Sequence, residues 1–302
     1  MCMLTATGGR HLGAPVRQHY IPQFYLSAWC SSGAPGEGSR LWVVENCGGN
    51  ISFFRRAPRA VGFQDRLYSF SEDVPAAERA ALETKVFQVL DDRGKSLVAN
   101  LMADQRLDSE ERGVWAMFIA GMRLRAPENI ALLKEVGARH VRLELGKGQG
   151  EYEALKEEGD PETFLEWVES TTPGLIQNFS LASVPRVLAG AVARKINKMS
   201  WHSPNFGDGR HRLLCSDRPC VFTAGIDDPD CVIALPLSPT RAFIAFYPGS
   251  RAEATLTQHG ANVIGAALNR NIVTQAKQRA FSLGKHDAPE SFFEKYLALS
   301  PV

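Results

Sequence analysis

The segment Arg17–Cys30, RQHYIPQFYLSAWC, brings a histidine, two glutamines and four aromatic residues together near the start of the chain. Pro22 suits the first turn of a helix, because its missing N–H would be unpaired there, so a short helix is expected from Pro22 to Trp29. Such aromatic density indicates burial. His19 and Gln23 are then polar groups at the edge of an aromatic cluster, and each needs a partner from elsewhere in the fold.

Working outward, the next segments predict β structure. Leu41–Val44 and Ile51–Phe54 are apolar runs on either side of the turn sequence Asn46–Asn50, which is typical of a β-hairpin. The segment 58–64 is expected to be irregular, and Leu67–Phe70 to be a short extended piece.

The middle of the chain changes to helical spacing of apolar residues. Helices are expected from Pro75 to about Leu101 and over Glu110–Leu124, Leu132–Leu145, Asp160–Val168 and Ser183–Met199. The glycine-rich run Gly146–Gly150 lacks the Gly-Lys-Ser/Thr ending of a phosphate loop and is interpreted as a flexible linker.

The last third returns to short apolar runs separated by Pro, Gly and Asp. Strands are expected at Met199–Ser203, His211–Cys215, Cys220–Thr223, Cys231–Leu235 and Arg241–Phe246, followed by a helix over Ala261–Arg279. The links are too short for crossover helices, which excludes βαβ units there. The fold class is therefore α+β: a short helix and hairpin, a helical middle, and an antiparallel sheet with a closing helix. We expect a mobile tail over 1–16, one intertwined domain over 17–285 and a C-terminal extension over 286–302.

The composition of the chain limits the kinds of partner and compartment that are expected. The 302 residues include 34 basic and 33 acidic side chains, so no global field attracts nucleic acid, which would need a local basic patch. No apolar run is expected to approach the ~18 residues that a membrane helix requires, because Arg, Lys or Glu interrupts even the richest segments, and no membrane association is expected. The six cysteines contain no C-x-x-C pair and follow no secretory leader, which predicts reduced thiols in the cytoplasm.

Familiar catalytic motifs are missing from the sequence: there is no G-x-S-x-G elbow, no H-E-x-x-H, no Walker loop and no complete Rossmann fingerprint. What remains is a set of polar residues in apolar or turn contexts. These are His19, Gln23, Asp65, Glu83, Arg125, Asp217 and Asn269. The sequence identifies no cofactor and no metal, and the partner is an unidentified small molecule or protein.

Each candidate also has a purely structural interpretation. His19 can be a hydrogen-bonded core residue rather than a base or ligand. Asp217, just before Pro219, can bond the backbone N–H groups of its own turn. Arg125 ends a helix, where a cation complements the dipole and caps carbonyls, and Glu83 is expected on a solvated helix face.

A local zinc site is a further hypothesis. If Met199–Ser203 pairs with His211–Cys215, then His202 faces His211 with Asp208 nearby, and two imidazoles plus a carboxylate can bind zinc. Histidines on exposed hairpins beside glycine-rich loops are more often incidental, and no third rigid ligand is evident.

Several segments resemble the bacterial family catalogued as domain of unknown function 4238. They are His19–Leu26, Phe63–Tyr68, Phe118–Pro127 with its Arg125-Ala126-Pro127 ending, Ser216–Pro219, Leu235–Pro239 and the helix around Asn269. The resemblance covers about Arg17 to Ser282 and implies no known activity. Arg218 replaces an Asn and Ala126 a Thr of the family pattern, so a role shared with the family is not expected for those two side chains.

Two functions follow as hypotheses. The first is a hydrolase or nuclease of a bacterial defence or mobile-element context, in which His19, Gln23, Arg125 and Asp217 are the catalytic set and His19 and Asp217 share one polar site. The second is a non-catalytic module for a ligand or protein partner. Neutral net charge favours the second over a nucleic-acid enzyme, and a shared water-accessible cleft would favour the first.

Overall fold

The opening segment lies at the centre of the molecule. In the computed structural model, which describes residues 17–32 and 38–298, it forms strand β1 (Arg17–His19), helix α1 (Gln23–Leu26) and the 3-10 helix η1 (Ser27–Trp29). The Tyr25 hydroxyl donates to the Pro236 carbonyl at 2.6 Å, and Trp29 Nε1 donates to the Leu213 carbonyl at 3.0 Å. The predicted helix and its burial are confirmed, and the aromatic polar tips tie it to the C-terminal third.

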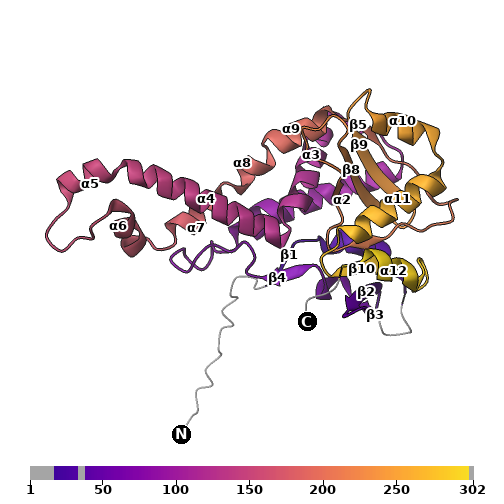
Figure 1. Cartoon of the computed structure of the whole chain (residues 1–302), viewed down its shortest axis with the longest axis horizontal. Helices are drawn as coiled ribbons and strands as arrows, with labels where there is room; N and C mark the ends of the chain where they lie inside the picture. Colours follow the sequence, from indigo (N-terminus) through magenta and orange to yellow (C-terminus); the bar gives the residue numbers. More distant parts are fainter. Residues whose placement is uncertain (1–16, 33–37, 299–302) are drawn as a thin grey trace, which may run out of the picture.

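The predicted hairpin is also confirmed, and it belongs to a larger sheet. Strands β2 (Leu41–Cys47) and β3 (Asn50–Arg56) pair in register around Gly48 and Gly49, whose φ angles of 62° and 92° suit a two-residue hairpin turn. The sheet order is β3-β2-β10-β6, completed by β10 (Arg279–Ser282) and β6 (Cys215–Ser216). The first and last thirds of the chain therefore share one antiparallel sheet (Figure 1).

A second antiparallel sheet has the order β5-β9-β8-β7. Its strands are β5 (Ser200–His202), β9 (Arg241–Phe246), β8 (Val232–Ser238) and β7 (Val221–Phe222). Both faces are covered, which explains the unbroken apolar runs. Phe243 contacts Trp115 on one face with ring centroids 5.4 Å apart, while Ala234 and Ile244 belong to the core cluster on the other.

The short strand after the hairpin differs from its prediction. Strand β4 (Phe63–Asp65) pairs with β1, and it follows the 3-10 helix η2 (Pro58–Ala60), whereas Leu67–Phe70 contains a turn and no strand. Gly62 precedes β4 with a φ of 66°, and its carbonyl accepts from the Tyr20 and Ile21 N–H groups. Backbone pairing therefore determines the position of β4, and the pattern of apolar residues does not reveal such pairing.

Helices dominate the middle as predicted. They are the π-helical segment η3 (Leu82–Phe87), α2 (Gln88–Met102), α3 (Ser109–Leu124), α4 (Pro127–Lys147), α5 (Gln149–Leu155), α6 (Phe164–Thr171), α7 (Leu175–Ala182), α8 (Val184–Leu188) and α9 (Ala191–Lys198). A capping box of Asp108 and Glu111 starts α3. The linker prediction for Gly146–Gly150 is wrong: most of this run is helical, and only Gly148 separates α4 from α5.

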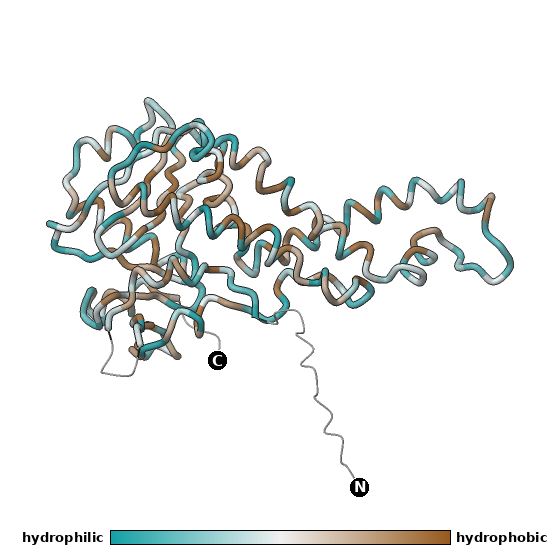
Figure 2. Tube along the Cα trace, turned by 180° about the vertical axis from the view of Figure 1, so that it is seen from behind, coloured by the Kyte–Doolittle hydropathy of each residue, from teal (hydrophilic) through white to brown (hydrophobic). Residues whose placement is uncertain are grey.

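Helices α4 to α7 form an arm that projects from the body (Figure 1). Within the arm, α4 packs against α6 and α7. Apolar side chains of the arm are exposed, and Figure 2 shows hydrophobic positions alternating with hydrophilic ones along it. They include Leu132, Val136, Leu143, Leu155, Trp167, Leu175 and Phe179.

One run among the described residues, Leu175–Lys198, is long and apolar enough to cross a membrane by length and composition alone. The expectation that no run comes near this threshold is therefore corrected. The run comprises the three short helices α7, α8 and α9, which contact α4 and α3, so the evidence for a membrane span is weak.

The closing elements cover the outer face of the second sheet and the end of the first. They are α10 (Arg251–Gln258), α11 (Ala261–Thr274) and α12 (Glu290–Tyr296). The predicted helix over Ala261–Arg279 stops at Thr274, after which β10 begins at Arg279. Phe293 of α12 is buried and packs edge to face on Phe53 of β3 with centroids 5.8 Å apart.

Candidate functional site

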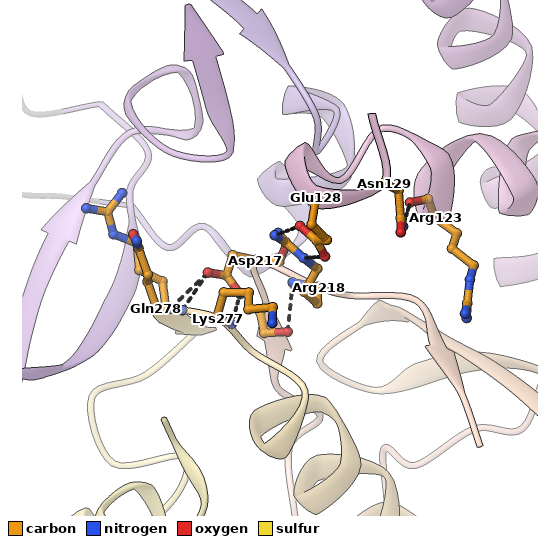
Figure 3. A network of polar contacts seen from close by, with 9 residues as sticks. Arg123, Glu128, Asn129, Asp217, Arg218, Lys277 and Gln278 are labelled. Carbon is orange, nitrogen blue, oxygen red and sulfur yellow. Dashed lines mark hydrogen bonds and ion pairs between the residues drawn. The ribbon is translucent and has the colours of Figure 1, made fainter. Parts of the chain in front are cut away.

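A polar cavity of about 210 Å³ lies where four distant segments meet. Tyr20 comes from the opening segment, Arg123 and Glu128 from the junction of α3 and α4, Asp217 from the turn after β6, and Gln275 from the end of α11. We call this space the Asp217 cavity, and Figure 3 shows its polar contacts.

Asp217 is 4% exposed, and its carboxylate bonds to the backbone before β10. Oδ1 accepts from the Lys277 N–H at 2.8 Å, and Oδ2 accepts from the Gln278 and Arg279 N–H groups at 2.8 and 3.2 Å (Figure 3). Burial raises the pKa of Asp217, and these hydrogen bonds offset only part of the effect. The prediction of bonds within its own turn is wrong, because the partners lie some 60 residues further along the chain.

Arg218 forms an ion pair with Glu128 at the edge of the cavity. Arg218 Nε donates to Glu128 Oε1 at 2.6 Å and a second nitrogen contacts Oε2 (Figure 3). The guanidinium also lies over the Tyr20 ring, 5.6 Å from its centroid. Burial, the largest single effect, raises the pKa of Glu128, but the hydrogen bonds from Arg218 and from the Glu128 backbone, together with nearby positive charge, outweigh it, and the pKa lies below its usual value. The Arg218 side chain is 15% exposed and that of Glu128 is 43% exposed, so a molecule in the cavity can reach the carboxylate.

Cys220 is the one thiol that lines the cavity, and it is not an activated nucleophile. Burial raises the pKa of Cys220 to about 12, so the thiol stays protonated at neutral pH. The nearby Arg123 guanidinium stacks on Phe222, 4.1 Å from the ring centroid. The five cysteines within the described residues are free.

A second set of polar residues lies inside the fold, and we call it the polar core cluster: His19, Tyr68, Glu83, Asp91 and Arg125. Arg125 is fully buried and pairs with Asp91, with Nη1 2.9 Å from the carboxylate. The Tyr68 hydroxyl donates to Glu83 at 2.5 Å and lies 3.3 Å from the His19 carbonyl. The expectation of a solvated Glu83 is therefore wrong, and burial raises the pKa of Glu83 despite this bond.

The His19 side chain lies at the edge of this cluster. Its ring packs on Phe63 with centroids 5.6 Å apart, and its Nε2 atom is buried and has no hydrogen-bond partner among the residues that the structure describes. Burial lowers the pKa of His19 below 6.5, although a backbone hydrogen bond at Arg59 and the charge of Asp91 act in the opposite direction. At neutral pH the imidazole is uncharged.

The structure thus brings two of the predicted residues together and separates the others. His19 and Arg125 belong to the polar core cluster, and both interact with Asp91. Within residues 17–32 and 38–298, no hydrogen bond or ion pair joins His19 to Asp217. Gln23 is exposed on the surface of α1 instead of bordering a buried site.

Other candidates have local roles. Asp65 is exposed in β4, whereas Asn269 is buried and bridges the Leu214 N–H and the Arg212 carbonyl at 2.8 Å each. Gln18 was missed: it is fully buried, donates to Ser69 Oγ at 2.9 Å and accepts from the Tyr68 N–H at 2.8 Å. Alternation in a strand beginning at Arg17 would have placed it inward, but three residues are too few for that signal.

The zinc hypothesis rested on a hairpin that does not form. Strand β5 pairs with β9, and β6 pairs with β10. His202 instead stacks on Phe246 with centroids 5.0 Å apart, and His211 is exposed. The part of the chain that the structure describes contains no group of three His, Cys, Asp or Glu side chains placed to hold a metal ion.

The two departures from the family pattern, Arg218 and Ala126, both line the Asp217 cavity. A search of curated proteins and a search of solved structures find no significant match. A family model described as "Protein of unknown function (DUF4238)" matches residues 17–286, which is most of the 302 residues. The chain therefore belongs to the DUF4238 family.

Proposed function

We propose that the protein is a non-catalytic binding module that holds a small polar molecule in the Asp217 cavity. The observation that carries this proposal is the convergence of segments far apart in the sequence on one cavity whose side chains are mostly polar. Several of these groups also bond one another or the backbone, but Glu128 keeps 43% of its side chain exposed.

The state of the polar groups supports binding rather than catalysis. Asp217 already accepts three backbone hydrogen bonds, and Cys220 is protonated, so neither is poised as a base or a nucleophile. Arg218 is held by Glu128 and by the Asp217 carbonyl at 2.7 Å. Such fixed donors and acceptors recognise a ligand without needing a change of protonation.

The size and lining of the cavity support a small ligand that is both donor and acceptor. Its volume of about 210 Å³ lies below the roughly 300 to 1,000 Å³ of sites for drug-sized molecules. A molecule of about amino-acid size fits, whereas an oligonucleotide does not. The Glu128 carboxylate, on a side chain that is 43% exposed, favours a ligand with an ammonium, amide or hydroxyl donor.

Calorimetric titration with single amino acids and their amides tests the proposal. For the compound that binds the wild type, Glu128→Gln should weaken affinity at least tenfold, since it removes a charge at the cavity edge. Glu135→Gln is the matched control, because Glu135 makes an exposed ion pair with Arg139 at 3.0 Å on the arm. An equal loss of affinity in both variants, or no binding of any compound, would contradict the proposal that the Asp217 cavity binds the ligand.

One observation favours a second candidate, a cytoplasmic hydrolase or nuclease of a bacterial defence or mobile-element context. Burial lowers the pKa of His19, so the imidazole is uncharged at neutral pH, and its Nε2 has no hydrogen-bond partner among the described residues and is free to take a proton. On this proposal His19→Ala abolishes hydrolysis of a phosphodiester or ester substrate while the melting temperature falls only modestly. Retained activity in the folded fraction, together with a large loss of stability, would identify His19 as structural.

A further inference from the structure

We infer that a second cavity, between the β7-β8-β9 face and helices α10 and α11, binds an uncharged apolar small molecule. The cavity has a volume of about 400 Å³, which lies within the range typical of small-molecule sites. It shares no lining residue with the Asp217 cavity, so this inference goes beyond the proposed function.

The walls of this cavity are apolar on both sides. Val221, Ala234 and Ile244 line it from the sheet, and Leu256 and Ile264 line it from α10 and α11. The apolar part of the lining holds an apolar ligand body more readily than water, because water needs polar partners, which only the rim supplies. An aliphatic or aromatic ligand body therefore matches this lining.

The polar groups of the lining are an ion pair, His259, two threonines and Asn271, and the charges of the ion pair bear on the charge of the ligand. Arg251 and Asp230 neutralise each other, with Nε 2.9 Å from Oδ2 and the Arg251 N–H donating to Oδ1 at 3.0 Å. The side-chain amide of Asn271 also lines the cavity and makes no hydrogen bond within the described residues. A neutralised ion pair plus a free amide favours an uncharged ligand with one hydrogen-bonding group, such as a fatty alcohol.

Helix α10 supplies a matched pair of positions for the test. Ala252 lines the cavity and Ala254, two residues further on, is exposed and does not. The helix has no fully buried residue, and its N-terminus is held by the Ser250 cap, which accepts from the Glu253 N–H at 3.3 Å. A larger side chain at either position therefore leaves the helix ends unchanged.

The experiment is a titration of the full chain with 1-decanol, and separately with decanoate, at pH 8. Calorimetry measures the binding. Saturable binding of 1-decanol is expected, with decanoate at least tenfold weaker. Ala252→Trp should weaken 1-decanol binding at least tenfold and Ala254→Trp should leave it unchanged. Ala267→Leu, which fills the cavity from α11, provides an independent second variant if Ala252→Trp does not fold.

Three results would overturn the inference: no saturable binding of 1-decanol, decanoate binding as tightly as the alcohol, or equal affinity in the Ala252→Trp, Ala267→Leu and wild-type proteins. The third result would show that decanol binds elsewhere, for example at the exposed apolar residues of the arm. Circular dichroism melting curves of each variant establish that the proteins compared are folded.

Discussion

Two consecutive residues belong to different polar regions, the polar core cluster and the Asp217 cavity. His19 belongs to the first and Tyr20 to the second. In the cluster, Arg125 is fully buried and pairs with Asp91, whereas in the cavity Glu128 keeps 43% of its side chain exposed. Two ion pairs of the same chemistry therefore differ in solvent access, and on the proposed function that difference separates a residue that holds the fold from one that meets a ligand.

The largest expected effect comes from breaking the buried pair. Arg125→Ala leaves Asp91 without its partner, and we expect a loss of about 3 to 5 kcal/mol in the free energy of unfolding. Arg139→Ala on the arm, which breaks an exposed pair, should cost at most about 1 kcal/mol. Urea unfolding measures both. Similar losses would show that the buried position of Arg125 does not determine its contribution.

A smaller loss is expected for the carboxylate that joins two strands. Asp217→Asn keeps the shape but replaces one acceptor oxygen by a donor facing backbone N–H groups, and we expect a loss of about 1 to 3 kcal/mol. Chemical denaturation gives the value. If stability is unchanged while ligand affinity falls, Asp217 contacts the ligand and belongs with Glu128 rather than with the structural groups.

The pH dependence of stability tests the uncharged state of His19. Its pKa is lowered in the folded protein, so the unfolded chain binds more protons just below pH 6.5. The free energy of unfolding should therefore decrease as the pH falls from 6.5 towards the lowered folded value. His19→Gln should flatten the curve in that window. An unchanged slope in the variant would assign the decrease to another group.

Removing the cavity ion pair should affect binding far more than folding. Arg218→Met is expected to change stability by no more than about 1 kcal/mol, since Glu128 stays partly hydrated. Ligand affinity should nevertheless fall severalfold, because Glu128 loses its fixed orientation. Paired unfolding and binding titrations separate the two quantities, and a stability loss comparable to that of Arg125→Ala would erase the contrast between the regions.

The smallest difference is expected between the reaction rates of two buried thiols. Burial raises the pKa of Cys215, in the core, and of Cys220, at the cavity, to about 12. Both should react slowly with a disulfide reagent in the folded protein, while the exposed Cys47 reacts first. Six free thiols should appear after denaturation without reductant. Fast reaction of Cys220 would show a more open cavity, and fewer than six thiols would contradict the prediction of a reducing compartment.

Local signals predicted the elements better than the site. Pro22 and its aromatic neighbours determined a helix, and the glycines after Asn46 determined a hairpin, because those effects act within a few residues. The partners of Asp217 and the pairing of Arg125 with Asp91 depend on contacts made by distant segments. Residue type alone therefore indicated that these polar groups needed partners, but it did not indicate which partners.

The sheet that joins β2 to β10 also constrains how the protein is made. Some 230 residues separate the end of β2 at Cys47 from the start of β10 at Arg279. At roughly 5 to 20 residues per second, a ribosome needs about 12 to 46 s to synthesise them. During that time one edge of the emerging hairpin has no strand beside it and is available to other chains or to a chaperone. This sheet can therefore be completed only after almost the whole polypeptide has been synthesised.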